Sequence, residues 1–183
     1  MTTAKLFMIL LGCKPEGRHT EQHDVFFAIA NEVKDLVPAI NAFWPEAKGK
    51  IHLDAYRVVS HVNGYKIEVA ERGAKEELKA SQRLFFMNLG GYQNSVFEEL
   101  HYKMLIVANE KAEAIKNAKE SEFFKRNFSA HIDDKYGVDV DDVFEIEEVL
   151  PKEMKSKYQL FFTPAQGLPT DELVLGYMPV DKL

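Results

Sequence analysis

Four short segments of the sequence place a histidine two residues from a carboxylate. They are Glu21/His23, His52/Asp54, Glu99/His101 and His131/Asp133. Residues two apart on a β-strand point to the same side, so each pair is expected to present an imidazole beside a carboxylate. Such pairs bind divalent metal ions, and they also fix the tautomer of a histidine for acid–base chemistry.

The same pairs also fit a purely structural role. A histidine entering a strand is commonly held by a hydrogen bond to a nearby carboxylate or backbone group. The spacing matches neither the His-Glu-x-x-His zinc motif nor a calcium-binding loop. We therefore favour a structural role, with a divalent metal site or acid–base catalysis as alternatives, and we predict no cofactor and assign no catalytic residue.

A second group of reactive side chains follows the first apolar run. Cys13 is a candidate nucleophile that His19 or His23 would assist. Lys14 and Arg18 are candidate ligands for an anion such as phosphate or carboxylate. The Gly-Lys-Ser/Thr of a P-loop is missing. For the cysteine we favour the simpler interpretation of an inert, packed side chain.

The histidine and carboxylate pairs, unlike this loop, recur because the sequence resembles itself. An ungapped shift places Gly12 on Gly90 and the first Glu-x-His pair on the second. One inserted residue later, the first His-x-Asp pair falls on the second. The sequence therefore predicts an internal duplication followed by a C-terminal extension. The predicted segments are pseudo-repeat one at 5–72, pseudo-repeat two at 83–150 and the extension at 151–183.

Each repeat is predicted to fold as β-β-α-β-β. Leu6–Leu11 and Val25–Ala30 are short apolar runs typical of buried strands. Apolar residues at helical spacing over 33–44 predict a helix, with Asn31 as its N-cap. Asn63-Gly64 then predicts a hairpin turn between two further strands.

In the second repeat the corresponding elements are a strand at Met104–Ala108 and a helix over about 110–124, capped by Asn109. Asp141-Asp142 is expected in the hairpin turn, before a strand at 143–149. We expect an α+β protein with antiparallel or mixed sheets and helices packed on them. The two repeats and the extension are predicted to form a single compact domain over 1–183.

Composition and charge narrow the function. The 183 residues hold 23 Lys and Arg against 29 Asp and Glu, a formal charge of −6, which argues against a nucleic-acid partner. The apolar runs are far shorter than the roughly 20 residues that span a bilayer. We find no signal peptide and predict a cytoplasmic protein without membrane contact. One cysteine excludes an internal disulfide framework.

Three segments resemble a known family. They are Lys5–Gly12, Glu21–Phe27 and His131–Asp142. These runs are similar to small bacterial proteins grouped as a domain of unknown function, the DUF1543 family. The resemblance implies a stand-alone bacterial cytosolic protein. It implies no activity and no catalytic residue.

Two functional hypotheses follow. The leading one is a non-catalytic binding or regulatory module that self-associates, since sheet edges offer surfaces for a second copy; its small-molecule ligand is not indicated by the sequence. The alternative is a small enzyme or metal-binding protein whose histidine and carboxylate site lies at the interface of the two repeats.

Overall fold

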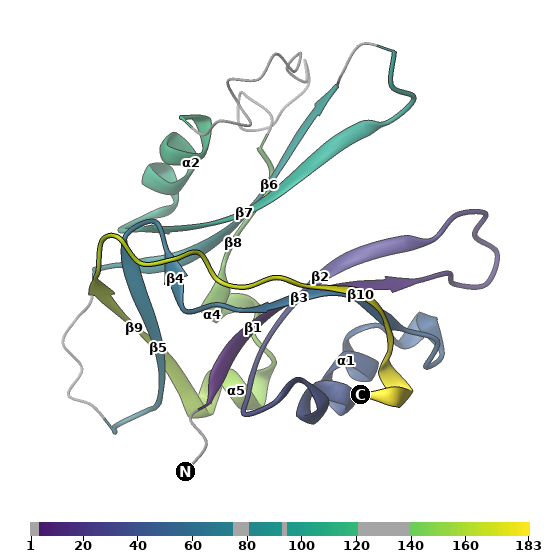
Figure 1. The fold of residues 1–183 in the computed structure, drawn as a ribbon, viewed down its shortest axis with the longest axis horizontal. Helices are drawn as coiled ribbons and strands as arrows, with labels where there is room; N and C mark the ends of the chain where they lie inside the picture. Colours follow the sequence, from purple (N-terminus) through teal and green to yellow (C-terminus); the bar gives the residue numbers. More distant parts are fainter. Residues whose placement is uncertain (1–3, 75–80, 93–94, 121–139) are drawn as a thin grey trace. The chain divides into compact units, whose positions relative to one another are not determined.

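The computed structural model of the protein describes residues 4–74, 81–92, 95–120 and 140–183 (Figure 1). This part of the chain is α+β, as predicted, with ten strands paired antiparallel and a few short helices. It divides into two compact units. Unit 1 comprises residues 1–77 and 150–183, and unit 2 comprises residues 78–149.

Unit 1 contains a four-stranded sheet in the order β10-β3-β1-β2. Its strands are β1 (Lys5–Cys13), β2 (Gln22–Ala30), β3 (His52–Val58) and β10 (Val174–Pro179). The predicted runs at the start of the chain thus form β1 and β2. β1 is apolar along most of its length because it is a central strand, with β2 and β3 hydrogen-bonded to its two edges.

The helix predicted over 33–44 is divided into η1 (Val33–Leu36), α1 (Val37–Phe43) and η2 (Pro45–Ala47). Pro38 explains the division, because proline has no N–H to donate and is tolerated only in the first turn of a helix, where it lies in α1. Leu36 and Ile40 are fully buried against the inner face of the sheet.

Asn31 and Asn109 were predicted as N-caps, but in both helical segments the N-cap is the glutamate that follows the asparagine. Glu32 is the N-cap of η1 and forms a capping box with Asp35, whose carboxylate accepts the Glu32 N–H at 3.1 Å. Glu110 is the N-cap of α2 (Lys111–Lys119). Asn109 supports that helix differently, because its N–H and its side-chain amide both donate to Glu113. A carboxylate in the first turn satisfies free N–H groups and faces the positive helix end.

Unit 1 also contains a three-stranded sheet in the order β4-β5-β9. Its strands are β4 (His61–Val62), β5 (Tyr65–Glu71) and β9 (Tyr158–Pro164). The predicted Asn63-Gly64 turn is confirmed, with φ of 33° and 85°, but it joins β4 to β5, since β3 pairs in the other sheet.

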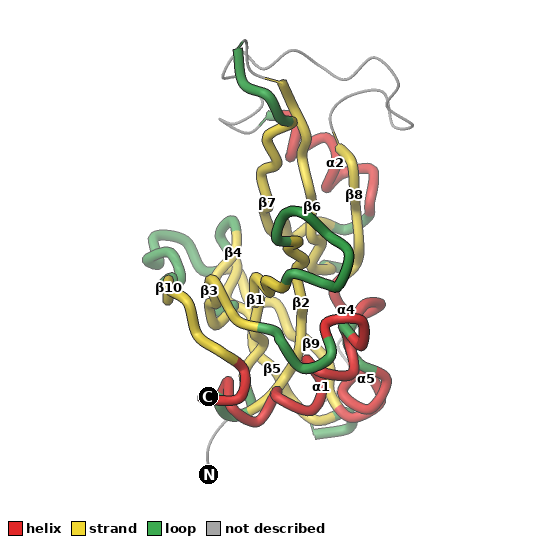
Figure 2. Tube along the Cα trace, turned by 90° about the vertical axis from the view of Figure 1, so that its right-hand side faces the viewer, coloured by secondary structure: helices red, strands yellow, loops and turns green. Residues whose placement is uncertain are grey.

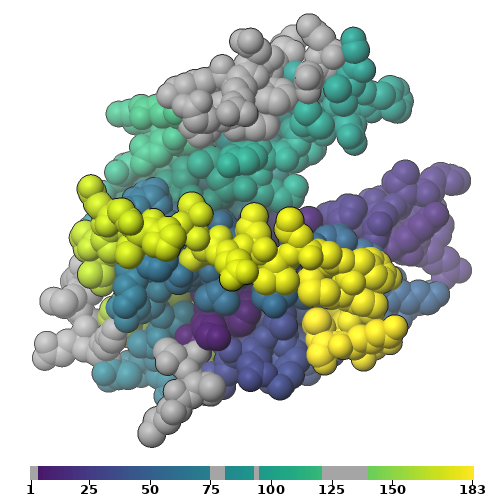
Figure 3. Space-filling view, viewed as in Figure 1, coloured from purple at the N-terminus to yellow at the C-terminus, as the bar shows by residue number. Residues whose placement is uncertain are grey.

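For the C-terminal extension the sequence predicts a short helix at 151–157 and strands at 158–162 and 173–180. The structure has α5 (Lys152–Lys157), β9 and β10 there. β9 pairs with β5 and β10 pairs with β3, so the extension is built into unit 1. Figure 3 shows its last part in yellow, running across the surface of that unit. η3 (Val180–Lys182) follows β10.

Unit 2 contains a three-stranded sheet in the order β7-β6-β8. Its strands are β6 (Arg83–Tyr92), β7 (Glu99–Ala108) and β8 (Val140–Glu145). Helix α2 packs along this sheet (Figure 2), where Ala114 and Ala118 are completely buried against it. Small side chains at these two positions let the helix approach the strands closely.

Two predictions for unit 2 are wrong. Asp141 and Asp142 lie inside β8 and not in a turn, and the predicted strand at 143–149 is replaced by the end of β8 and a short helix, α4 (Ile146–Val149). Val143 and Ile146 are both buried, and their spacing of three residues does not fit one face of a strand. The repeated segment around His131 and Asp133 lies outside the described residues.

Candidate functional site

The first cluster consists of Glu21, His23, His52 and Asp54, in unit 1. Gly12, near the end of β1, stands opposite His23 on β2 and opposite His52 on β3. The β1–β3 register shifts between Leu10 and Leu11, so that Asp54 is an extra residue in β3. Asp54 nevertheless shares the side of β3 that His52 occupies two residues earlier, and the two side chains are in contact.

Asp54 lies between the two imidazoles of the first cluster. Its Oδ2 atom is 3.2 Å from His23 Nε2 and its Oδ1 atom is 3.3 Å from His52 Nε2. Glu21 Oε1 approaches the same nitrogen of His52 at 2.7 Å. The side chain of His52 is only 8% exposed, whereas that of His23 is 45% exposed. The cluster thus extends from the surface into the sheet.

Tyr177 on β10 completes the surroundings of His52. The two rings have centroids 4.3 Å apart and planes inclined by 37°. The β10–β3 register shifts between Leu175 and Met178, and Gly176 within the shift has a φ of 137°. The sequence did not predict this contact, although a glycine inside an apolar strand segment is the usual signal of a bulge.

The second cluster consists of Glu99, His101 and Asp141, in unit 2. One ligand atom from each residue lies within 4.8 Å of the others, and it is the one such set of three found among the described residues. His101 Nε2 is 3.2 Å from Asp141 Oδ2 and 3.8 Å from Glu99 Oε2. All three side chains are partly exposed.

The second cluster occupies the ladder positions of the first. Gly90 on β6 stands opposite His101 on β7, and Glu99 lies two residues before that histidine. The β6–β8 register shifts between Asn88 and Leu89, which makes Asp141 the extra residue. Asp54 therefore corresponds by strand register to Asp141, whereas the sequence comparison matched it to Asp133.

A glycine lines each cluster. A Cβ atom added at Gly12 would lie closer than 3.0 Å to His52 Nε2 and Asp54 Oδ2. One added at Gly90 would lie equally close to Asp141 Oδ2 and Glu99 Oε1. Neither glycine has a positive φ, so backbone conformation does not require glycine at these two positions. The close approach of the neighbouring side chains does, because it leaves no room for a Cβ atom.

The candidate histidines and carboxylates within the described residues therefore form one cluster in each unit. Four of the predicted polar residues meet in unit 1, and Glu99 meets His101 and the unpredicted Asp141 in unit 2. The predicted partners His131 and Asp133 lie outside the described residues.

The loop candidates do not gather in this way. Cys13 is 1% exposed and packs in the core of unit 1, while Lys14, Arg18 and His19 are exposed. Burial raises the pKa of the Cys13 thiol, and the negative charge of Glu21 raises it further. A higher pKa opposes the thiolate that a nucleophile requires. Anion binding by this loop stays a prediction.

A serine, a histidine and an aspartate also meet near the start of β4. Ser60 Oγ is 2.9 Å from His61 Nδ1, which is 3.6 Å from Asp171 Oδ1. Both partners approach the same ring nitrogen, whereas a catalytic triad uses opposite nitrogens for the nucleophile and the acid. The buried Asp171 carboxylate also accepts the N–H groups of Ser60 and His61 at 3.0 and 3.3 Å. This group anchors the segment before β10.

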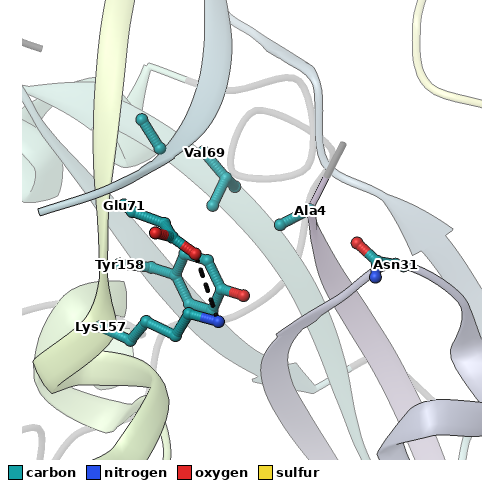
Figure 4. A pocket seen from close by; sticks show the side chains of 7 residues that line it. Ala4, Asn31, Val69, Glu71, Lys157 and Tyr158 are labelled. Atoms are coloured by element: carbon teal, nitrogen blue, oxygen red, sulfur yellow. Dashed lines mark ion pairs between the residues drawn. The ribbon is translucent and has the colours of Figure 1, made fainter. Parts of the chain in front are cut away.

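Figure 4 shows a further pocket of about 300 Å³, lined by Ala4, Asn31, Val69, Ala70, Glu71, Lys157 and Tyr158. Lys157 Nζ lies 3.2 Å from Glu71 Oε1 and 5.0 Å from the centre of the Tyr158 ring. A hydrogen bond with Tyr158 and the carboxylate of Glu71 raise the pKa of Lys157. The lysine is therefore held as a cation by its own neighbours.

Among the helices of the described residues, none has the length and apolar character needed to cross a membrane.

Comparison with known proteins supports the resemblance seen in the sequence. Residues 18–69 match the family described as Domain of Unknown Function (DUF1543). A comparison with curated proteins gave no match. A solved structure, of the protein Il1583 from Idiomarina loihiensis, is similar with a TM-score of 0.64 and 22% identity, and the match covers 97% of each chain. At this identity the likeness concerns the fold alone.

Proposed function

We propose that this protein binds a divalent cation at the second cluster. The observation that carries the proposal is the convergence of Glu99, His101 and Asp141, with ligand atoms all within 4.8 Å of one another. A divalent ion bonded at about 2.1 Å holds its ligands roughly 3 to 4 Å apart. Small side-chain movements would bring the three atoms to such an ion.

Charge supports the same proposal. Glu99 and Asp141 approach each other beside Gly90, and His101 is the one imidazole of the cluster. Two carboxylates held together repel each other, and a bound cation removes that repulsion. The partial exposure of all three side chains gives an ion a route from solvent.

The ligand types indicate the class of ion. One imidazole and two carboxylates suit manganese, iron(II) or zinc. Three protein ligands would leave coordination positions for water or a small ligand. The proposal assigns cation binding and no catalytic step.

The matching registers support a second part of the proposal, an origin of the two clusters by duplication. In both units a glycine on the central strand faces a histidine, a glutamate precedes that histidine by two residues, and a bulge on the third strand supplies an aspartate. Each unit also connects its second and third strands through a helical segment, which is η1 to η2 in unit 1 and includes α2 in unit 2.

Calorimetry with Mn²⁺ on untagged, EDTA-treated protein tests the cation site. We expect binding to wild type and at least a tenfold loss of affinity in Asp141→Asn and in Glu99→Gln, since each removes a charged ligand. Glu98→Gln is the matched control, because it removes the same charge from the adjacent, exposed residue. Undiminished Mn²⁺ affinity in both ligand variants would exclude the site.

A further inference from the structure

We infer that the outer edge of β10 pairs with the same edge of a second copy of this chain, forming a twofold dimer. The surface consists of the β10 backbone and the side chains of Leu173, Leu175 and Tyr177. This inference concerns unit 1 and does not depend on the cation site proposed in unit 2.

β10 is an edge strand with an exposed apolar side. One of its edges is hydrogen-bonded to β3, and within the described residues no strand pairs with the other edge. Leu173, Leu175 and Tyr177 are 57%, 70% and 71% exposed, and residues two apart on a strand point to the same side. Each of the other described strands has at most one exposed large apolar side chain. Figure 3 shows the β10 segment, in yellow, on the surface of unit 1.

The opposite edge of the same sheet is protected. β2 forms that edge, and the Ile29 N–H there donates to the sulfur of Met154 at 3.1 Å. The first residues of β2, Gln22, His23 and Asp24, are polar and exposed. Covering groups and polar side chains keep an edge strand from pairing with another chain. The four-stranded sheet therefore has one edge suited to association, and it is β10.

Charge indicates which partner fits this edge. Residues 173–180 contain no charged side chain, so two copies of β10 can lie antiparallel without placing like charges opposite each other, although the whole chain carries a formal charge of −6. Pairing of two identical antiparallel edges is self-complementary about a twofold axis. A strand with charged side chains would instead bury them against three apolar groups, which is costly.

The size of the surface fits a weak dimer. At the exposures given above, the three side chains would remove on the order of 700 Å² from solvent in two copies, and the paired backbone adds to this area. Stable interfaces bury about 1,200 to 2,000 Å² in total. Gly176 lies in a bulge and Pro179 has no N–H to donate, so the new ladder is short. We therefore expect a dissociation constant in the micromolar range.

Sedimentation velocity on the full chain tests the dimer. We expect wild type to pass from monomer to dimer as its concentration rises from low to high micromolar. Leu175→Lys and Leu173→Lys should each raise the dissociation constant at least tenfold, because a lysine on an edge strand opposes pairing. Val149→Lys is the matched control, since it makes the same substitution at an exposed apolar residue of unit 2. Circular dichroism verifies the fold of every variant.

Two results would overturn the inference. One is a wild-type chain that stays monomeric at high micromolar concentration, and the other is a dimer that persists in both leucine variants, since it would use another surface. Mn²⁺ calorimetry separates this inference from the proposed function. Leu175→Lys should bind Mn²⁺ as wild type does, and Asp141→Asn should dimerise as wild type does. Loss of the dimer in Asp141→Asn would place the contact in unit 2 and contradict the inference.

Discussion

The two clusters occupy equivalent positions in their sheets but differ in how many imidazoles accompany their two carboxylates. In the first cluster, two imidazoles face two carboxylates, and one imidazole is buried against a tyrosine. In the second cluster, one imidazole faces two carboxylates, and all three groups reach solvent. The strand framework thus brings histidines and carboxylates together at equivalent positions in both units, and the number and burial of the imidazoles distinguish the two clusters.

The largest expected contrast concerns stability. His52→Ala removes a buried ring and leaves Glu21 and Asp54 facing each other, so we expect a loss of about 3 kcal/mol in the free energy of unfolding. His101→Ala removes an exposed ring and should cost less than about 1 kcal/mol.

Urea unfolding measures this contrast. Trp44 is the only tryptophan and packs against the core of unit 1, so its fluorescence reports unit 1, while circular dichroism reports both units. Equal destabilisation by the two substitutions would show that the buried imidazole does not distinguish the clusters.

The two glycines provide the next contrast. Gly90→Ala should weaken Mn²⁺ binding by about 10- to 100-fold, because the methyl group displaces two ligand groups of the second cluster. Gly12→Ala displaces His52 and Asp54 in unit 1 and should leave Mn²⁺ affinity unchanged. Calorimetry with Mn²⁺ measures both variants, and equal weakening by Gly12→Ala would contradict the assignment of the ion to unit 2.

Tyr177 should influence one cluster only. Tyr177→Ala removes the ring that packs on His52, and we expect a loss of about 1 kcal/mol in the free energy of unfolding, with Mn²⁺ affinity unchanged. Tyr177→Phe preserves the ring and should preserve stability. Urea unfolding followed by Trp44 fluorescence measures both variants, and a loss in the phenylalanine variant would assign the effect to the hydroxyl group.

The smallest effect concerns the thiol of unit 1. Because burial raises the pKa of Cys13 above its usual 9.0 in the folded chain, folding keeps the thiol neutral. The stability gained is present below pH 9.0 and is lost as the pH rises through the folded value. Urea unfolding of unit 1 should therefore show a slight alkaline loss of stability that Cys13→Ser lacks. Identical alkaline profiles would contradict this prediction.

Elements decided by local sequence were predictable. β1, β2, α5 and the Asn63-Gly64 turn follow from apolar runs, helix formers and turn chemistry within a few residues. The resemblance to the DUF1543 family is likewise confirmed by the match over residues 18–69. Self-association and a cytoplasmic location stay predictions.

The candidate site was predictable in part. The Glu-x-His pairs were found because residues two apart share a strand face, and the structure keeps Glu21 with His23, and Glu99 with His101, in their respective clusters. Asp141 was missed because a bulge depends on pairing between strands, which no local pattern encodes.

The division of unit 1 into two chain segments has a consequence for folding. Its pairings of β3 with β10 and of β5 with β9 must close loops on the order of 100 residues, which is slow because chain entropy opposes such contacts. The contacts of unit 2 span only residues 78–149. Unit 2 is built from one continuous segment, so we expect it to fold without β9 and β10, whereas the sheet that holds the first cluster is incomplete until β10 pairs with β3.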